Sequence, residues 1–380
     1  MASIYKPLGS QDITSTKTLL NEAIPITGSI PSGSYNDNNI KNYNHGMFQG
    51  VFDYPYLSSS ANHLFDLTVG YAADSNLSSS TNSQNAKKIN IYNQMAQVLM
   101  GYDKDGNIQK FDRDGNLTGG EKLNEVLFMN FSRLLTKDEI KKGTFELILG
   151  VGQQASPPLF EQGTDALFKN RIKLTDRSGS DGYFVNSPVG EYGVVYAQSD
   201  DGSGDGSTTM ISGESYGDAT TFPAVGLLFY QAGVLVLSGS CFNDAAHGGV
   251  LHDSNVGTTE MGSRFGVTGF QSVTGSEISA SADAFRARLY NVQFNNTIEL
   301  NSTIHFCRVN HNEFNYSSNK TYLSGSTLRV VKTVNDSALS YVTTIGLYSS
   351  NNTLLAVGKL SEPLRCDPTI ELTLRLRLDY

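Results

Sequence analysis

The sequence predicts a mainly β protein with a few short helices, built from antiparallel β-sandwich domains. Charged residues make up only 17% of the 380 residues, while Gly, Ser, Asn and Thr are abundant. This composition favours short strands and tight turns over long solvated helices. The last ninety residues contain six strand-like runs, separated by Gly, Asn, Ser, Asp and Pro. These runs predict a C-terminal β-sandwich that ends on a core strand.

The final run gives the clearest strand pattern. Five apolar residues alternate with five polar residues up to Asp379: Ile370, Leu372, Leu374, Leu376 and Leu378 against Glu371, Thr373, Arg375, Arg377 and Asp379. A period of two places one face on a core and the other in water. Five more strands are expected over residues 291–298, 302–309, 326–334, 341–348 and 352–360.

Residues 1–50 are expected to form an extended N-terminal arm. Pro7, Pro25 and Pro31 interrupt the segment together with several glycines. A lone helix is predicted over residues 13–23, with Thr14 or Ser15 as its N-cap. The alternative is an arm that is disordered in the free monomer and becomes ordered along a neighbouring subunit.

Residues 51–143 are expected to form a mixed α/β region. Apolar side chains at spacings of three and four predict an amphipathic helix over residues 85–100. Two Asp-Gly pairs, at Gly106 and Gly115, predict hairpin turns, because glycine adopts the positive φ angles that such turns need. A calcium loop is the weaker alternative, since counting from Asp103 puts Gly106 at position 4 instead of 6. Thr136 and Glu139 match a capping box and predict a short helix that ends at Gly143.

Residues 144–285 are expected to form a β-rich domain with long polar loops, and residues 286–380 the C-terminal sandwich. A strand is predicted over residues 145–150, and a central hairpin, buried on both faces, around Gln231 and Gly233. Residues 200–207, 213–219 and 243–275 read as exposed loops.

Charge and cysteine content exclude several classes of protein. A net charge of −9 argues against a general nucleic-acid clamp, whose affinity comes from neutralised phosphates. Three distant cysteines form no disulfide framework, and the start of the chain lacks the apolar core of a secretory signal. The most apolar stretch is shorter than the ~20 residues of a membrane-spanning helix. We therefore expect a soluble protein made in a cytoplasm, with no membrane partner.

No catalytic, cofactor or metal site is predicted. His305, Cys307 and His311 lie close in sequence, and Cys366 would join them if the fold brought it near, but no second metal-ligand pair completes a zinc site. The sequence lacks a nucleophile elbow and a phosphate-binding loop. We expect a protein that is not an enzyme and has no cofactor.

Several short motifs resemble virion structural proteins of contractile-tailed phages, with the nearest likeness among cyanophage and related aquatic phage proteins. They are Phe314-Asn-Tyr-Ser-Ser-Asn, Thr343-Thr-Ile-Gly-Leu-Tyr, Leu354-Leu-Ala-Val-Gly-Lys-Leu-Ser-Glu-Pro and Arg375-Leu-Arg-Leu-Asp-Tyr, with further likeness at Tyr230-Gln-Ala-Gly and Tyr54-Pro-Tyr-Leu. The resemblance implies a structural subunit associated with the tail or baseplate, located in the virion. It brings no active-site residues.

The functional expectation is therefore self-association and docking onto other virion proteins, in symmetric copies. Tyrosine concentrates binding energy at buried contacts, so the candidate interface residues are Tyr5, Tyr35, Tyr54 and Tyr56. Two alternatives stay open: a neck or capsid decoration protein, and a carbohydrate-binding adhesin. A host glycan partner has no support in the sequence, and the absence of Trp counts against it.

Overall fold

The computed structural model describes residues 5–27, 37–75, 78–154, 168–176, 183–199, 224–239, 277–286, 289–317, 323–328, 333 and 335–380. Within these residues the chain is mainly β, with large antiparallel sheets and few helices, as the sequence predicted. The chain divides into two compact units. The terminal unit comprises Met1–Leu20 and Glu299–Tyr380, and the central unit comprises Asn21–Ile298.

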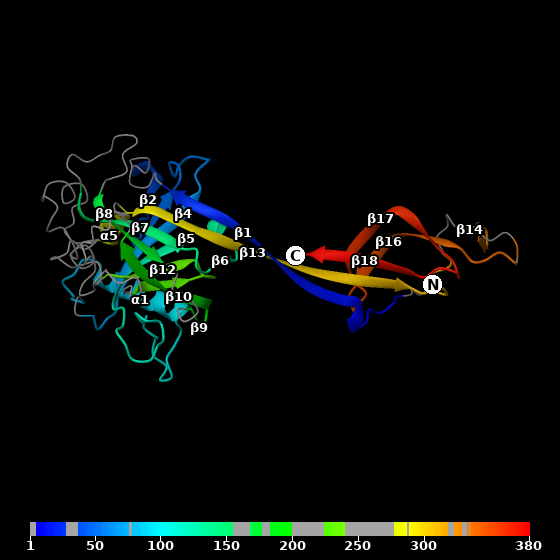
Figure 1. Ribbon diagram of the computed structural model, residues 1–380, viewed down its shortest axis with the longest axis horizontal. Coiled ribbons are helices and arrows are strands. Elements are labelled where there is room, and N and C mark those ends of the chain that lie inside the picture. The colour runs from blue at the N-terminus through cyan, green and yellow to red at the C-terminus, as the bar shows by residue number, and fades with distance from the viewer. Residues whose placement is uncertain are drawn as a thin grey trace. The chain divides into compact units, whose positions relative to one another are not determined.

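These bounds differ from the four expected regions of residues 1–50, 51–143, 144–285 and 286–380. The difference arises because two long strands, β1 (Ile13–Thr27) and β13 (Leu289–Val309), each contribute residues to both units. The start of the chain therefore shares a unit with its end, a pairing that local sequence patterns do not reveal. Figure 1 shows β1 and β13 running side by side as neighbours in one sheet.

A 14-stranded sheet has the order β1-β13-β7-β8-β10-β11-β12-β5-β4-β3-β2, with β18 and β6 also on β13, and β9 on β10. Its remaining strands are β2 (Ile40–Asn42), β3 (Gln49–Phe52), β4 (His63–Tyr71), β5 (Glu125–Phe131), β6 (Glu139–Ile140), β7 (Glu146–Gln154), β8 (Phe168–Thr175), β9 (Tyr183–Ser187), β10 (Gly190–Ser199), β11 (Ala224–Phe229), β12 (Val234–Ser238) and β18 (Leu372–Asp379). The expected hairpin at Gln231 and Gly233 is confirmed, since every residue of β12 and all but the first of β11 are buried.

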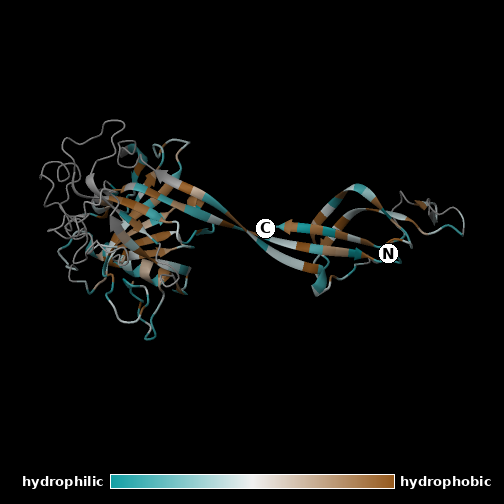
Figure 2. Cartoon of the chain, in the orientation of Figure 1, coloured by the Kyte–Doolittle hydropathy of each residue, from teal (hydrophilic) through white to brown (hydrophobic). Residues whose placement is uncertain are grey.

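The core of the central unit lies where this sheet folds back on itself. Strands β5 and β13 are separated by five strands in the sheet order, yet the rings of Phe131 and Phe294 lie 5.2 Å apart, edge to face. Phe145 packs against both rings. Two layers of one sheet therefore face each other in a sandwich-like arrangement, with apolar residues concentrated along the strands (Figure 2).

Helix α1 (Asn85–Leu99) covers strand β4 and confirms the helix predicted there. It buries Tyr92, Ala96 and Leu99. Gly70 of β4 allows the backbone of α1 to lie close to the strand, because glycine has no side chain. A Cβ atom at this position would lie 2.8 Å from the carbonyl oxygen of Lys88 and 3.0 Å from the amide nitrogen of Tyr92. A second helix, α5 (Ile278–Arg286), also contacts β4.

A buried carboxylate ties three strand ends of the central unit together. Asp176, directly after β8, accepts hydrogen bonds from the backbone amides of Gly143 (2.7 Å) and Phe145 (3.1 Å) and from the hydroxyl of Tyr230 (2.9 Å). Burial raises the pKa of Asp176 despite these three donors, because desolvation penalises the charged form more than the hydrogen bonds favour it.

The terminal unit is a small sandwich of two sheets. One sheet contains β1, β13 and β18, and the other is the hairpin of β16 (Ser340–Tyr348) and β17 (Leu354–Cys366). The two sheets approach closely at Gly358, where a Cβ atom would lie 2.8 Å from Cδ1 of Leu376. The predicted alternation of the last strand is confirmed, since its leucines are more buried than the residues between them. A two-residue hairpin, β14 (Leu323–Ser324) and β15 (Thr327–Leu328), completes the described strands.

Two predicted helices are wrong. Residues 13–23 belong to strand β1, because Ile and Thr, which are branched at Cβ, suit an extended chain that pairs with β13. Pro25 is tolerated inside β1 because this strand forms the end of the sheet order. Thr136 ends the short helix α2 (Arg133–Thr136) instead of starting one, and Glu139 lies in β6, paired with β13.

The structure joins two of the predicted strands into one and confirms a predicted turn. Residues 291–298 and 302–309 are one continuous strand, β13, and not two. The turn at Gly106 is confirmed: Tyr102 and Ile108 form an antiparallel bridge, and the carboxylate of Asp103 accepts the amide hydrogens of Asp105 and Asn107. The expected loops over residues 200–207, 213–219 and 243–275 lie outside the described residues.

Gly70→Ala is expected to destabilise the central unit by about 1–3 kcal/mol, because the added methyl group would overlap the backbone of α1. Urea unfolding followed by far-UV circular dichroism measures the change in the free energy of unfolding. Gly9→Ala is the matched control, since its nearest neighbour would be Oδ2 of Asp12 at 3.5 Å, an ordinary contact. Equal effects of the two substitutions would contradict the proposed role of Gly70.

Asp176→Asn should destabilise the central unit by about 1–3 kcal/mol, because an amide offers one acceptor oxygen where the carboxylate satisfies two backbone donors. The raised pKa of Asp176 means that its folded state holds a proton more tightly than the unfolded chain. Its contribution therefore weakens as pH rises above the ordinary value of 3.8. Unfolding at several pH values should show a flatter profile in the variant. An unchanged profile and an unchanged free energy would contradict this role.

Candidate interaction surface

The N-terminal segment, residues 5–20, is held on the terminal unit by charged side chains as well as by strand pairing. Lys6 contacts Glu313 at 2.5 Å, Arg308 contacts Asp12 at 2.8 Å, and Lys17 contacts Glu299 at 2.6 Å. Each pair joins this segment to β13 or to the turn after it, about three hundred residues later in the sequence. The pairs therefore fix where the start of the chain lies on the terminal unit.

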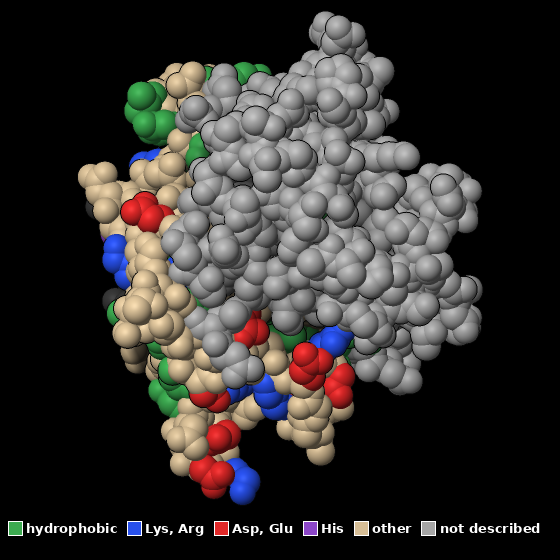
Figure 3. All heavy atoms as spheres, turned by 90° about the vertical axis from the view of Figure 1, so that its left-hand side faces the viewer, with side chains coloured by type: hydrophobic (Ala, Val, Ile, Leu, Met, Phe, Trp, Pro, Cys, Tyr) green, Lys and Arg blue, Asp and Glu red, His purple; other side chains and the backbone are tan. Residues whose placement is uncertain are grey.

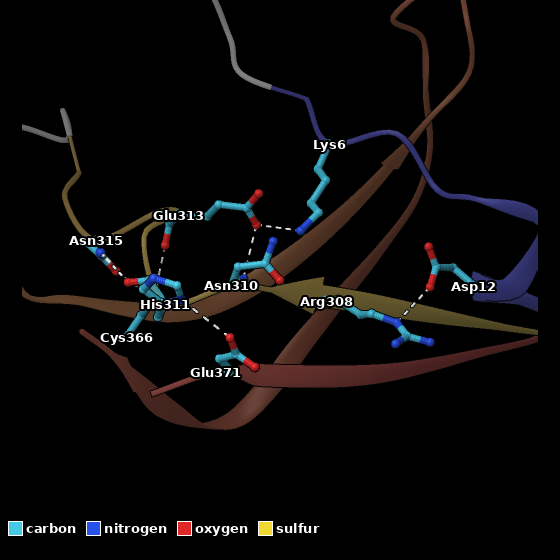
Figure 4. Close-up of polar contacts among 9 residues, drawn as sticks. All are labelled: Lys6, Asp12, Arg308, Asn310, His311, Glu313, Asn315, Cys366 and Glu371. Atoms are coloured by element: carbon cyan, nitrogen blue, oxygen red, sulfur yellow. Dashed lines mark hydrogen bonds and ion pairs between the residues drawn. The ribbon is translucent and has the colours of Figure 1, made fainter. Parts of the chain in front are cut away.

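Figure 4 shows that Glu313 binds both the N-terminal segment, through Lys6, and the turn after β13, through Asn310. Its carboxylate accepts a hydrogen bond from Nζ of Lys6 and another, of 3.1 Å, from the backbone amide of Asn310. These interactions lower the pKa of Glu313, with the Lys6 hydrogen bond as the larger cause. The carboxylate thus binds the N-terminal segment and also stabilises the turn that follows β13.

Asp12 has a similar double role. Its carboxylate accepts the backbone amide of Gly9 at 3.0 Å and pairs with the guanidinium of Arg308. The hydrogen bond from Gly9 is the main cause that lowers the pKa of Asp12, and Arg308 adds to it. Both carboxylates of this contact are therefore stabilised in their charged form.

Tyr5 lies at the end of this segment, against the aromatic ring of Tyr348 in β16. The ring centroids are 4.8 Å apart, with the planes tilted by 58°. Tyr348 and Leu354 both lie over Gly346, and Val357 is the cross-strand partner of Gly346. We call Tyr5, Tyr348, Leu354 and Val357 the apolar face. All four side chains are exposed to solvent although they are large and apolar.

The described residues of the terminal unit include few buried apolar side chains. Among its described residues, the buried apolar side chains are Ile304, Val309, Cys366 and Leu374, while all the other buried apolar side chains belong to the central unit. Twelve of the eighteen exposed large apolar side chains of the described chain lie in the terminal unit. Contiguous exposed apolar surface marks contact sites more often than ordinary solvent-facing surface does.

Three of the four tyrosines that the sequence singled out lie in the described part of the chain. Tyr5 belongs to the apolar face. Tyr54 is exposed in the central unit, and Tyr56 packs near Phe52 there, with ring centroids 6.4 Å apart. Tyr35 lies outside the described residues. Of the three described tyrosines, Tyr5 therefore belongs to the terminal unit, and Tyr54 and Tyr56 belong to the central unit.

Sequence reasoning missed Tyr348, Leu354 and Val357. Their signal is the run Leu354-Leu-Ala-Val357, which places apolar residues on both faces of one strand. A strand with one face in water alternates apolar and polar residues, so this run indicates that the second face also meets another surface. The end of β16 shows the same feature, with Leu347 followed by Tyr348.

The candidate metal ligands do not form a metal centre. His305 and Cys307 share a face of β13, paired with Leu376 and Leu374. Cys366 is buried, with its sulfur 3.4 Å from the carbonyl oxygen of Glu313, and burial raises the pKa of its thiol. His311 contacts Glu371 at 3.4 Å (Figure 4). No group of three or more His, Cys, Asp or Glu residues suited to a metal ion occurs in the described part of the chain.

Charged side chains of opposite sign are interleaved on the surface of the central unit. Lys110 pairs with Asp74 and Arg113 pairs with Glu121, while Lys122 pairs with the buried carboxylate of Asp112. In Figure 3, acidic and basic side chains lie beside one another along the lower edge of the described surface. A nucleic-acid site needs a continuous basic stripe, and this part of the surface does not supply one.

Acid should loosen the N-terminal segment. The lowered pKa values of Asp12 and Glu313 mean that both contacts contribute fully above the ordinary values of 3.8 and 4.5, and lose their contribution as pH falls below them. Hydrogen exchange of the N-terminal peptide, corrected for the intrinsic rate at each pH, should therefore speed up in acid. Glu313→Gln should reproduce the effect at neutral pH.

Glu371→Gln serves as the control for this experiment, because Glu371 is exposed and contacts His311 instead of the N-terminal segment. Exchange that stays the same in Glu313→Gln, or that rises equally in both variants, would show that the Lys6 pair does not hold the segment.

Among the described residues, no helix combines the length and the apolar character needed to cross a membrane. Comparison with protein-family models, curated proteins and solved structures finds no match to this chain. Its function therefore has to be argued from its own residues.

Proposed function

We propose that this chain is a non-enzymatic structural subunit of a tailed-phage virion, associated with the tail or baseplate. It acts by self-association and by docking onto neighbouring virion proteins. The terminal unit supports this proposal most directly, because its described residues bury four apolar side chains and expose twelve large ones. The motifs that resemble phage structural proteins lie largely in the same unit.

The physical argument concerns stability. A domain of about 100 residues is stabilised mainly by burial of apolar surface, worth ~25 cal/mol per Å², against a large cost in conformational entropy. The described residues of the terminal unit bury only four apolar side chains by themselves. Contacts with other chains would supply the missing burial, as happens in subunits that are stable only in an assembly.

A neck or capsid decoration protein would also rely on contacts with other chains, but at a different location in the particle. The carbohydrate-binding adhesin is a different class, and it would need a concave site with aromatic platforms and convergent polar groups. The apolar face is instead formed by side chains on a strand hairpin, together with Tyr5. This arrangement favours a protein partner over a sugar.

Immunogold electron microscopy of the encoding phage tests the location. Antibodies raised against the recombinant chain are expected to label the tail or baseplate of purified particles, with pre-immune antibodies as the control. Label on the neck or capsid would favour the decoration protein. If detergent-opened and intact particles both stay unlabelled while the antibodies detect the chain in infected cells, the virion proposal is wrong.

Deleting most of the expected N-terminal arm, residues 1–45, is an obvious way to test assembly, but it is a poor test for this chain. It would remove β1, which pairs with β13, and would expose the edge of β13. A loss of assembly would then follow from damage to the sheet. Point substitutions on the exposed surface separate folding from contact formation.

A further inference from the structure

We infer that the apolar face formed by Tyr5, Tyr348, Leu354 and Val357 is a contact surface for a second copy of this chain. This inference rests on the proposed function and deepens it by naming the surface and the partner. The face lies wholly within the terminal unit and is formed by described residues.

The face is large enough to form most of the apolar part of an ordinary protein interface. A tyrosine side chain presents on the order of 200 Å², and the four side chains are each about half exposed, so together they offer on the order of 350 Å². A stable interface buries about 800 Å² per partner, of which about 60% is apolar. The neighbouring Leu355, which is 67% exposed, adds to the apolar surface. The face therefore supplies most of the apolar area that a stable contact between two copies needs.

The β16–β17 hairpin itself needs a partner. It is a two-stranded sheet, and such hairpins are marginally stable in water unless a face is well covered. One side packs on β18 through Gly358 and Leu376, but no residue of β16 or β17 between Tyr341 and Arg365 is fully buried. Covering the other side with protein would bury the apolar face and complete the sandwich.

Two features favour a second copy over an unrelated chain. A unit that depends on a contact for its stability needs that contact from synthesis onward, and another copy of the same chain is present at that time. Lys359 and Glu362, two exposed residues of β17, also have opposite charges. A surface with both signs meets a copy of itself without net repulsion.

The decisive variant is Val357→Asp in the full-length chain, compared with Val185→Asp. Both valines are exposed residues of strands, at 52% and 72%, but Val185 lies in β9 of the central unit. Light scattering with size-exclusion chromatography should give an oligomer for the parent chain and for Val185→Asp. Val357→Asp should lose the oligomer peak and run as a monomer. A monomeric parent chain at all concentrations, or an unchanged mass of Val357→Asp, would overturn the inference.

A second measurement covers the outcome in which Val357→Asp unfolds the terminal unit. Hydrogen exchange of peptides from β16 and β17 is followed in the parent chain over a wide range of protein concentration. Protection should increase with concentration if copies meet at this face, whereas peptides from β4 and β5 should not change. Protection of β16 and β17 that is independent of concentration would contradict the inference. The two proposals can fail separately. If the chain forms an oligomer through the apolar face but purified particles do not contain the chain, the inference about this face holds and the virion role is wrong.

Discussion

The pairing of β13 is the interaction on which both units depend. Its first half pairs with β7 and β6 in the central unit, and its second half, from Ser302, pairs with β18 in the terminal unit. Strand β1 lies beside it as its other neighbour. These partner strands come from both ends of the chain and from its middle. Pairing them with β13 therefore brings together residues that are far apart in the sequence. Such pairings are slow to form, because the entropy of loop closure is lost before the contacts are gained.

Sequence reasoning succeeded where a pattern is set by local chemistry. The alternation of the last strand, the helix with Tyr92 and Leu99 on its buried face, and the turn at Gly106 each follow from periodicity or from the φ angles that glycine allows. It failed where distant pairing outweighed local preference. Residues 13–23 carry acceptable helix signals, but strand β13 offers this segment a neighbour for backbone pairing.

The candidate surface was only partly predictable for the same reason. Tyr5 was singled out as an anchor, but its ring partner Tyr348 lies more than three hundred residues away in the sequence. No local pattern links them. The apolar run that starts at Leu354 was visible as a strand, and its two apolar faces were the signal for a second contact. Reading that signal required knowing that one face already packs on β18, at Leu376.

The two features of the terminal unit, its charged contacts and its apolar face, meet at adjacent residues. Lys6 is fixed by Glu313, and Tyr5, the preceding residue, packs on Tyr348. Because neighbouring residues share one backbone segment, the ion pair limits the freedom of the tyrosine and lowers the entropy that a bound partner would have to remove. Neutralising Glu313 is therefore expected to free the ring of Tyr5 without changing any residue of the apolar face. The ion pair is weak by the standard of a buried contact, since both side chains are about one-third exposed. In the proposed contact between copies, its role would be to hold the ring of Tyr5 in place before the second chain binds.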